Sequence, residues 1–351
     1  MLRAIAVAEM IHGHSLDGLL DVGLRSTPFF TNWTYVRGYT APVFLFAAGF
    51  AFAVVTLPHI KDYSVFSREL LRRIQRLLYL IFIGYFLHLP FFSLRKTILS
   101  IGTQAWDDLL RVDILRCIGV SVLFLQVWLL LRPKREVTWV VIGLFTIALP
   151  ILTPYVNNSE LLFGLPPVIR YYFVNSNFPL FYNSSFLLLG FLLGYLFFEK
   201  KESWLLYALI IAMALIVIAQ IFGKAGIAPD LQSFMYKGGV IVLLTILLER
   251  GEVLWRRMPS ALKYFGRESL VVYVVHLILI YGSVLNKGLV SYWGQTLSYR
   301  ELYLFMIWLM STMVLVTYVW HKLKREHAPV ANWLRSTVFW SLLILFLLRP
   351  Y

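Results

Sequence analysis

The chain has 351 residues, of which 60% are apolar and only 14% are charged. Soluble domains usually carry about 25% charged residues, so this composition excludes an ordinary water-soluble enzyme. Aromatic residues make up 17% of the chain, and an intrinsically disordered protein does not keep so many of them in water. The composition therefore predicts a polytopic integral membrane protein.

The formal net charge of +14 comes from 32 Lys and Arg residues set against 18 Asp and Glu residues. A charge of this size is also typical of nucleic-acid-binding proteins, so the positions of the basic residues decide its meaning. The single cysteine, Cys117, lies in an apolar run, which excludes a disulfide framework and a cysteine-based metal site. We expect no metal cofactor.

About eleven runs of the sequence are apolar enough for a membrane-spanning helix, which needs roughly 20 residues. The first run is polar for a span and the last is short, so we predict an all-α fold of about 10 or 11 transmembrane helices. We treat residues 1–351 as a single transmembrane domain. The predicted spans are residues 2–20, 41–57, 77–94, 113–131, 139–156, 179–198, 204–222, 234–248, 269–285, 301–320 and 337–348.

The loops between these runs test the division, because cytoplasmic loops are enriched in Lys and Arg. With a cytoplasmic N-terminus, most of the basic residues fall in the inner loops. We therefore assign the excess charge to topology and not to nucleic-acid binding. We expect a multi-pass protein of the plasma membrane, which is the inner membrane in a bacterium. The inner loops are residues 58–76, 132–138, 199–203, 249–268 and 321–336.

The first span holds the densest set of intramembrane ionisable residues, and such residues are functional candidates because they are costly in lipid. At 100° per residue, Arg3 and His14 lie about 20° apart around the helix, roughly 16 Å apart along it, and Asp17 lies about 60° from His14. Arg3 is then placed to hold an anionic group, His14 to act as a base, and Asp17 to fix the imidazole tautomer. Glu9 and His12 point elsewhere on the helix.

Other residues are candidates for lining a cavity. Asp113 and Arg116 are i,i+3 neighbours and are expected to pair. A buried polar network that joins helices is the alternative interpretation of every such group. The basic segment 68–76 suits either lipid headgroups or the phosphates of a cofactor. The cavity-lining candidates are Glu9, His12, Asp113, Arg116, Ser269, Tyr273 and His276, and the cofactor-binding candidates are Arg3, Arg72, Arg73 and Arg76.

Several segments resemble the transmembrane acyltransferase superfamily, which includes the acyltransferase-3 and the heparan-α-glucosaminide N-acetyltransferase-like families. The opening LRAIAVAEMIHGH is similar to the family's first helix, with an Arg, ten residues and a His that fall on Arg3 and His14. The segment VDILRCIGVSVLFLQ resembles the bacterial heparan-acetyltransferase-like branch. Further similar segments are TAPVFLFAAGFAFA, RELLRRIQRLLYL and GRESLVVYVVH.

The resemblance implies an acyl-CoA-dependent O- or N-acyltransferase. An acyl group, usually acetyl, would pass from cytoplasmic acyl-CoA to a saccharide or glycolipid acceptor on the outer side. His14 would be the catalytic histidine, and Arg3 with the arginines at 72, 73 and 76 would lie near CoA. Family members usually carry a short basic lead before the Leu-Arg, whereas this sequence starts at Met1. The animal enzymes place a key His in the first outer loop, and residues 25–39 contain none.

Two other classes of function remain open at this stage. A secondary transporter or exporter of a glycan-related or small anionic solute would use Glu9, His14 and Asp113 as a proton relay. A structural partner in envelope-glycan synthesis would need none of these residues. The sequence leaves open whether the acyl group transfers directly or through an acyl-His14 intermediate, and whether the protein is a homo-oligomer.

Overall fold

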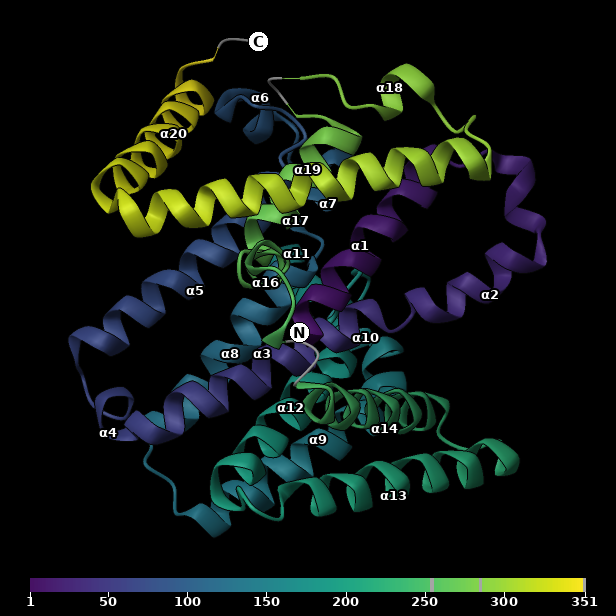
Figure 1. The fold of residues 1–351 in the computed structure, drawn as a ribbon, viewed down its shortest axis with the longest axis vertical. Helices are drawn as coiled ribbons and strands as arrows, with labels where there is room; N and C mark the ends of the chain where they lie inside the picture. The colour runs from purple at the N-terminus through teal and green to yellow at the C-terminus, as the bar shows by residue number, and fades with distance from the viewer. Residues whose placement is uncertain (253–255, 284–285, 350–351) are drawn as a thin grey trace. The chain divides into compact units, whose positions relative to one another are not determined.

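The structure is a computed structural model that describes residues 1–252, 256–283 and 286–349. Helices connected by short loops make up most of these residues (Figure 1). The described residues contain no β-strand, and only isolated bridges join Leu20 to Leu297 and Gly282 to Lys287. The predicted all-α fold is confirmed. The last two residues of the predicted span 269–285 lie outside the described residues.

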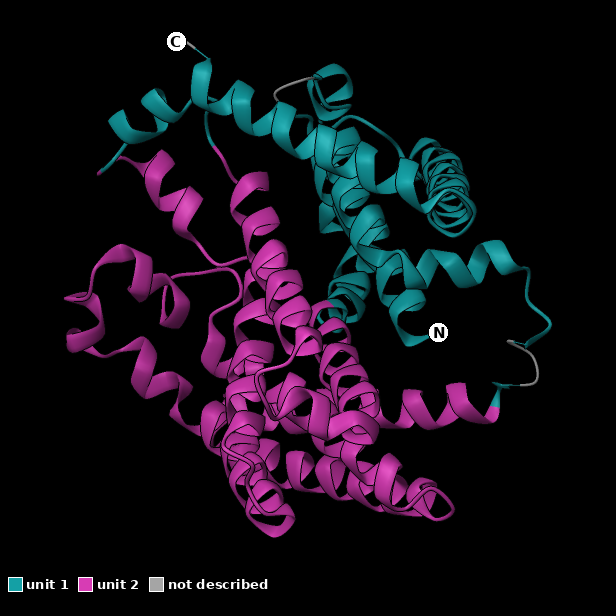
Figure 2. Ribbon diagram, turned by 90° about the vertical axis from the view of Figure 1, so that its left-hand side faces the viewer, with its two compact units in different colours: residues 1–40, 90–101, 251–351 teal, residues 41–89, 102–250 magenta. Residues whose placement is uncertain are grey.

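The chain divides into two compact units, which Figure 2 distinguishes by colour. Unit 1 comprises Met1–Thr40, Pro90–Ile101 and Gly251–Tyr351, and unit 2 comprises Ala41–Leu89 and Gly102–Arg250. The first predicted span and the last three therefore belong to the same unit, although about 250 residues separate them in the chain.

In unit 1 the first helix, α1 (Leu2–Leu19), packs against three helices from the C-terminal part of the chain, α16, α17 and α19. Its apolar side chains Val7, Ile11 and Leu16 are fully buried. The helices of unit 1 are α1, η1 (Val22–Ser26), α2 (Pro28–Arg37), α6 (Leu94–Leu99), α16 (Ser260–Arg267), α17 (Ser269–Tyr281), α18 (Val290–Trp293), α19 (Tyr299–Glu326) and α20 (Ala328–Leu348).

Local signals set several helix boundaries in unit 1. The Thr27 side chain caps α2, and Pro28 occupies its first position, where the missing N–H has no cost. Ser298 and Glu301 form a capping box at the start of α19. Between α16 and α17 the chain bends by 82°. This bend lies at the boundary between the predicted inner loop 249–268 and the predicted span 269–285.

Unit 2 holds most of the apolar helices, with α12 the most buried of its candidate spans. A side chain at Gly190 of α12 would overlap the carbonyl of Phe46 on α3, so these two helices approach backbone to backbone. The helices of unit 2 are α3 (Thr40–Thr56), η2 (Leu57–His59), α4 (Ile60–Tyr63), α5 (Arg68–Leu87), α7 (Gln104–Leu110), α8 (Ile114–Leu130), α9 (Arg135–Asn157), α10 (Glu160–Phe163), α11 (Pro167–Phe173), α12 (Leu180–Glu199), α13 (Trp204–Ala225) and α14 (Pro229–Arg250).

Within the described residues, seven helical segments are long and apolar enough to cross a membrane, or up to nine if each of two bent pairs counts as one span. The bent pairs are α7 with α8 and α16 with α17. Every predicted run falls on a helix, but α1 and α5 carry too many charged residues to meet the same test. The protein is thus a polytopic membrane protein, and its orientation stays a prediction.

Candidate functional site

His14 lies on α1, and a tyrosine of α17 holds its ring. The Tyr281 hydroxyl lies 3.4 Å from His14 Nδ1 and donates to the His14 carbonyl oxygen at 3.2 Å. A phenol has one hydrogen to donate, and Tyr281 donates it to the His14 carbonyl oxygen. The contact with Nδ1 therefore has His14 Nδ1–H as the donor and the Tyr281 oxygen as the acceptor. His14 Nε2 then keeps its lone pair, which is the tautomer that a general base requires.

A second imidazole, that of His276 on α17, lies beside His14 with 5.3 Å between the ring centroids. His276 is fully buried, and its Nδ1–H donates to the Val272 carbonyl oxygen at 2.6 Å. Its Nε2 is buried and makes no hydrogen bond within the described part of the chain. Buried polar atoms usually have a partner, so this nitrogen marks a place for a donor from water or substrate.

Tyr273 and Ser269, the other two candidates on α17, lie nearer to the beginning of the helix than His276 does. The Tyr273 ring contacts His276 edge-on, with 6.0 Å between ring centroids. Ser269 is the first residue of α17, directly after the bend. Of the three cavity-lining candidates on α17, His276 thus lies beside His14 with Tyr273 against it, and Ser269 lies at the other end of the helix.

Asp17 does not hold the position that the sequence suggested for it. Its carboxylate pairs with Arg37 of α2, at 2.5 and 2.7 Å, and its carbonyl oxygen accepts from Arg25 at 2.8 Å. No hydrogen bond joins Asp17 to the His14 ring in the part of the chain that is described. Tyr281 occupies the place next to Nδ1 at which Asp17 had been expected.

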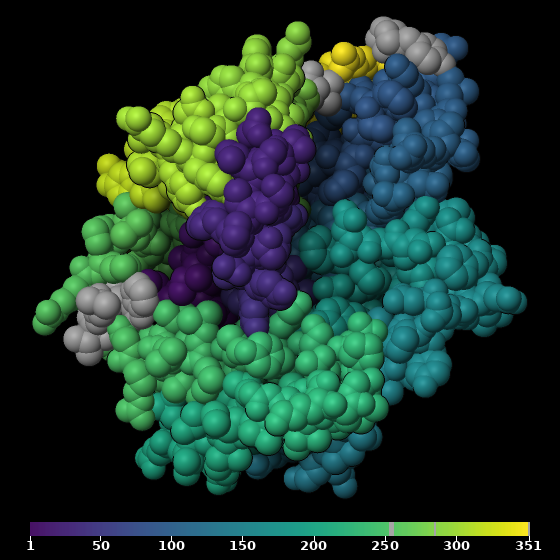
Figure 3. All heavy atoms as spheres, turned by 90° about the vertical axis from the view of Figure 1, so that its right-hand side faces the viewer, coloured from purple at the N-terminus to yellow at the C-terminus, as the bar shows by residue number. Residues whose placement is uncertain are grey.

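Glu9 and His12 form a separate cluster on another face of α1, as the helix periodicity predicts. Glu9 Oε2 lies 3.2 Å from His12 Nδ1, and Trp33 of α2 donates its indole N–H to Glu9 Oε1 at 2.9 Å. The Tyr303 hydroxyl of α19 lies 3.4 Å from His12 Nε2. In Figure 3, α2 is the indigo ridge in front of α1 and beside the yellow-green α19. The Phe29 ring of α2 contacts the Tyr303 ring of α19.

Arg3 lies at the beginning of α1, about three turns before His14. Among the described residues, its guanidinium makes no hydrogen bond and no ion pair. The structure therefore leaves its charge available, as the sequence prediction of an anion-holding residue requires.

The three candidate arginines of α5, in unit 2, divide into two kinds. Arg72 and Arg76 are exposed, whereas Arg73 is half-buried. The Arg73 guanidinium stacks on the Tyr63 ring at 3.4 Å and donates to Gln126 Oε1 at 3.1 Å. Arg73 thus holds α4 and α8 against α5, and only Arg72 and Arg76 present their charges to a ligand.

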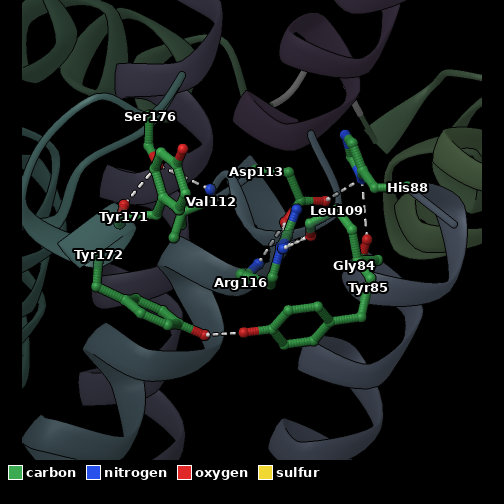
Figure 4. Close-up of polar contacts among 10 residues, drawn as sticks. All are labelled: Gly84, Tyr85, His88, Leu109, Val112, Asp113, Arg116, Tyr171, Tyr172 and Ser176. Carbon is green, nitrogen blue, oxygen red and sulfur yellow. Dashed lines mark hydrogen bonds and ion pairs between the residues drawn. The ribbon is translucent and has the colours of Figure 1, made fainter. Parts of the chain in front are cut away.

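Asp113 and Arg116 form the expected pair in unit 2 (Figure 4). Arg116 Nε donates to Asp113 Oδ1 at 3.0 Å and Nη1 donates to the Leu109 carbonyl at 2.7 Å. Both side chains are buried, with 3% and 0% of their surface exposed. The Asp113 carboxylate also caps α8. The pair therefore closes the bend between α7 and α8.

Aromatic and imidazole groups of α5 and α11 surround this pair. The Arg116 guanidinium lies 4.5 Å from the centre of the Tyr85 ring, and the Tyr85 and Tyr172 hydroxyls are 3.1 Å apart. Burial, and then the hydrogen bond with Tyr85, raises the pKa of Tyr172. His88 donates from Nδ1 to the Gly84 carbonyl at 2.9 Å and lies 3.9 Å from Asp113 Oδ2. The cluster joins four helices of unit 2.

Sequence reasoning missed the residues that hold the α1 candidates in place. These residues lie on α2, which had been taken as an outer loop, and on the ends of α17 and α19. Aromatic residues in the segment 25–39 were the available signal for α2, but aromatic residues are also common as membrane anchors. The missed residues are Trp33, Arg37, Tyr281 and Tyr303.

No group of three or more His, Cys, Asp or Glu side chains suitable for a metal ion occurs in the described residues. The long apolar helices define a multi-pass membrane protein, and the half-buried His14 is its candidate site for acyl transfer. The model of the acyltransferase-3 family, described as an acyltransferase domain, matches residues 1–321. The chain belongs to this family and is a membrane acyltransferase. A comparison with curated proteins found no match.

Proposed function

We propose that the protein moves an acetyl group from cytoplasmic acyl-CoA to a carbohydrate hydroxyl or amine on the outer side of the membrane. Membership of the family supports acyl transfer in general. The donor, the acetyl group and the acceptor are what the resemblance to the transmembrane acyltransferase superfamily implies, and the chemistry of the candidate residues supports the donor and the acceptor. We place the protein in the plasma membrane with a cytoplasmic N-terminus, and treat the whole chain as one functional domain.

The observation that carries the proposal is the state of the His14 imidazole. Its Nδ1 is engaged by Tyr281, and its Nε2 has no partner among the described residues. A neutral imidazole with a vacant Nε2 removes a proton from an attacking hydroxyl or amine. Of the histidines on α1, His12 is contacted at both ring nitrogens, by Glu9 and Trp33 at Nδ1 and by the Tyr303 hydroxyl at Nε2. His14 is therefore the stronger candidate for the base.

Two routes use this nitrogen. In direct transfer, the acceptor oxygen or nitrogen attacks the thioester carbon, the C–S bond breaks, and the proton taken by His14 passes to the CoA thiolate. In the covalent route, Nε2 itself attacks the thioester carbon, and the C–S bond breaks to release the CoA thiolate. The acceptor then takes the acyl group from the imidazole, and its proton passes to the thiolate. In both routes Tyr281 orients the ring and stabilises charge that develops on it.

The donor proposal rests on the cationic groups. Acyl-CoA carries several phosphates, and arginine is well suited to bind them. Arg3 is on the same helix as His14, about 16 Å along its axis, a span comparable to an extended pantetheine arm. In unit 2, Arg72 and Arg76 are exposed and suit a phosphate-bearing cofactor or lipid. Arg73 supports them by holding α5 in position.

The acceptor proposal rests on the aromatic and polar groups beside α1. The faces of Trp33 and Tyr303 lie next to the Glu9 and His12 side chains. Aromatic faces flanked by hydrogen-bonding side chains are a suitable lining for a polar ligand that also has apolar faces, and sugars have both kinds of surface. We therefore favour a saccharide or glycolipid as the acceptor.

The test uses purified protein in nanodiscs, given acetyl-CoA and a panel of saccharide acceptors, with release of the CoA thiol as the readout. His14→Asn keeps a side-chain donor toward Tyr281 but lacks Nε2. We expect it to reduce transfer by about 10²–10⁴-fold, the usual contribution of a general base. His59→Ala, which removes an exposed histidine, serves as the control and should retain full activity. Unchanged transfer in His14→Asn would overturn the assignment, and acceptor transport without CoA release would favour a transporter.

A further inference from the structure

Helix α17 carries both residues that lie against the His14 ring, Tyr281 and His276. The position of α17 along and around its own axis therefore decides whether these side chains meet the imidazole. A rotation by one residue would turn them by about 100°, and a shift by one residue would move them by about 1.5 Å. The contacts that fix the beginning of α17 consequently act on the candidate site at its other end.

Glu268 is the residue at which α16 ends and α17 begins. Its backbone N–H donates to the Tyr264 carbonyl oxygen at 2.8 Å, and its own carbonyl oxygen accepts from the N–H groups of Val271 and Val272 at 2.9 and 3.2 Å. The two helices meet here at an angle of 82°. A continuous ladder of backbone hydrogen bonds keeps a single helix straight, but no such ladder runs across a junction between two helices. Side-chain contacts therefore have to fix this angle.

The Glu268 side chain joins this bend to α19. It is buried, with 9% of the residue exposed, and both of its carboxylate oxygens lie 2.6 Å from Lys324 Nζ. His321 Nδ1 lies 3.1 Å from Oε1 of the same carboxylate. His321 and Lys324 are three residues apart, so they share one face of α19. Two side chains of one helix thereby hold the carboxylate.

Aromatic contacts hold the same junction from the side of α16. The His321 ring stacks on the Tyr264 ring, with 3.9 Å between the centroids and 17° between the planes, and the Tyr318 ring lies 6.3 Å from Tyr264. Helix α19 is continuous over 28 residues (Figure 1). Nearer to its beginning, Tyr303 contacts His12 of α1. Helix α19 therefore connects the bend to the helix that carries His14.

We propose that Glu268 is a positioning residue for acyl transfer: its ion pair with α19 sets the position of α17 and so holds Tyr281 and His276 against the base. The inference rests on the proposed function, to which it adds a residue that contacts neither the base nor the substrate. Glu268 precedes His276 by eight residues and Tyr281 by thirteen, about 12 and 20 Å along the helix. A change of about 5° in the bend would therefore move the His276 ring by about 1 Å.

The exposure of the pair favours positioning over stability as its role. The Lys324 side chain is 41% exposed and the Glu268 side chain 10%. Because solvent screens a partly exposed pair, it adds little to the free energy of unfolding. Its larger contribution is the conformation that it selects, since the buried carboxylate is satisfied only when α17 leaves the bend in the direction that brings Glu268 to α19.

The first experiment separates kcat from KM. Glu268→Ala should lower kcat by about tenfold to a hundredfold, the cost that a displacement of about 1 Å can have, and leave the KM for acetyl-CoA near the wild-type value. Glu268→Gln keeps one oxygen for Lys324 and should recover part of the loss. Lys324→Ala breaks the pair from its exposed side and should also lower kcat at constant KM.

The matched control is Glu252→Gln, which breaks the exposed pair with Arg256 in the same unit. It should transfer as the wild type does. Melting temperatures are measured for every variant, so that kcat is compared between folded proteins. Wild-type kcat in both Glu268→Ala and Lys324→Ala overturns the proposal, and so does a loss that appears in KM alone.

The second experiment asks whether Glu268 acts through the side chains of α17. In a chain that already carries Tyr281→Phe and His276→Asn, Glu268→Ala should lower kcat no further, because the groups that it positions are gone and the effects of coupled residues are not additive. In a chain with Tyr292→Phe, at an exposed tyrosine, Glu268→Ala should keep its full effect. Equal losses in the two backgrounds overturn the proposal, since general destabilisation would act on both alike.

The third experiment needs no catalysis and separates the positioning of α17 from the proposed function. With 3-fluorotyrosine at position 281, the ¹⁹F resonance of the nanodisc-bound protein reports the surroundings of this ring beside His14. Glu268→Ala should shift or broaden the resonance, and Glu252→Gln should leave it unchanged. If Glu268→Ala changes the resonance but the wild type transfers no acetyl group, the proposed function fails and the control of α17 by Glu268 stands. If transfer depends on His14 while neither kcat nor the resonance responds to Glu268→Ala, only the positioning role is overturned.

Discussion

Two clusters of ionisable side chains, one on α1 in unit 1 and one at the start of α8 in unit 2, differ in how their charges are paired. Asp113 and Arg116 form an ion pair. The Asp113 carboxylate also accepts from the Arg116 backbone N–H, and the Arg116 guanidinium donates to the Leu109 carbonyl oxygen. On α1, His14 and Arg3 keep a ring nitrogen and a guanidinium without partners in the described residues. We call the first cluster closed because its two charges pair with each other, although Asp113 Oδ2 and Arg116 Nη2 make no hydrogen bond within the described residues. We call the second cluster open because the charge of Arg3 has no counter-charge in the described part of the chain.

This difference separates structural from functional charge in the membrane. A buried charge is costly unless it is paired, and the pair in unit 2 meets this condition internally. In unit 1, by contrast, the Arg3 charge has no counter-charge in the described residues, and the buried Nε2 of His276 on α17 has no hydrogen bond there. Substrate is the natural partner for both. Variants in the closed cluster should therefore change stability, and variants in the open cluster should change transfer.

The largest effect is expected in the closed cluster. Arg116→Met leaves Asp113 as a buried, unpaired carboxylate, which should lower the free energy of unfolding by about 3–5 kcal/mol. Thermal unfolding of the purified protein in detergent measures the loss. The double variant Asp113→Asn with Arg116→Met removes both charges and should recover part of it. A single variant that melts like the wild type but no longer transfers acetyl would show that this cluster takes part in the reaction.

Part of this comparison could be predicted from the sequence. The spacing of residues on an ideal helix separated Glu9 and His12 from His14, and the contacts with Trp33 and Tyr281 confirm the separation. The i,i+3 spacing also predicted the pair of Asp113 with Arg116. Both results depend only on positions within one helix, where periodicity fixes direction.

Contacts between distant segments could not be predicted. Tyr281 lies 267 residues from His14, and nothing in the spacing of either helix indicates their contact. Asp17 had a suitable angle toward His14, but Arg37 of an unforeseen helix competes for it. In the same way Tyr63 and Gln126 take up Arg73. A helical wheel gives the direction of a side chain but not its partner, so the choice among several partners needs the fold.

The open cluster should respond most clearly at His276. His276→Asn keeps a donor for the Val272 carbonyl and loses Nε2, so we expect kcat to fall by roughly tenfold to a hundredfold, the cost of leaving a buried substrate donor without its acceptor. The KM for acetyl-CoA should stay constant, since the donor phosphates bind elsewhere. His276→Gln places a polar atom near the Nε2 position and should lose less. Equal losses in both variants, together with a lower melting temperature, would assign His276 to packing alone.

A smaller effect is expected at Tyr281. Tyr281→Phe removes the hydroxyl that holds His14 Nδ1 and keeps the ring, so the cost should be that of one neutral hydrogen bond, about 0.5–1.5 kcal/mol. The rate of transfer should fall by up to about tenfold with unchanged thermal stability. Tyr292→Phe, at a 69% exposed tyrosine of the same unit, is the matched control. Full activity in Tyr281→Phe would mean that the His14 tautomer is set by another group.

The smallest effect is expected at Asp17, and it tests the comparison most directly. The pair with Arg37 is partly exposed, with 26% and 46% of the two side chains accessible, so solvent weakens it to about 0.2–1 kcal/mol. Asp17→Asn should therefore change both the melting temperature and the rate of transfer only slightly, and Arg37→Gln should reproduce the same small change. A loss of transfer as large as that of His14→Asn would instead return Asp17 to the role that its angle on the helix suggested. The tautomer of His14 would then be set within α1 itself, and Tyr281 would be a neighbour without influence on the base.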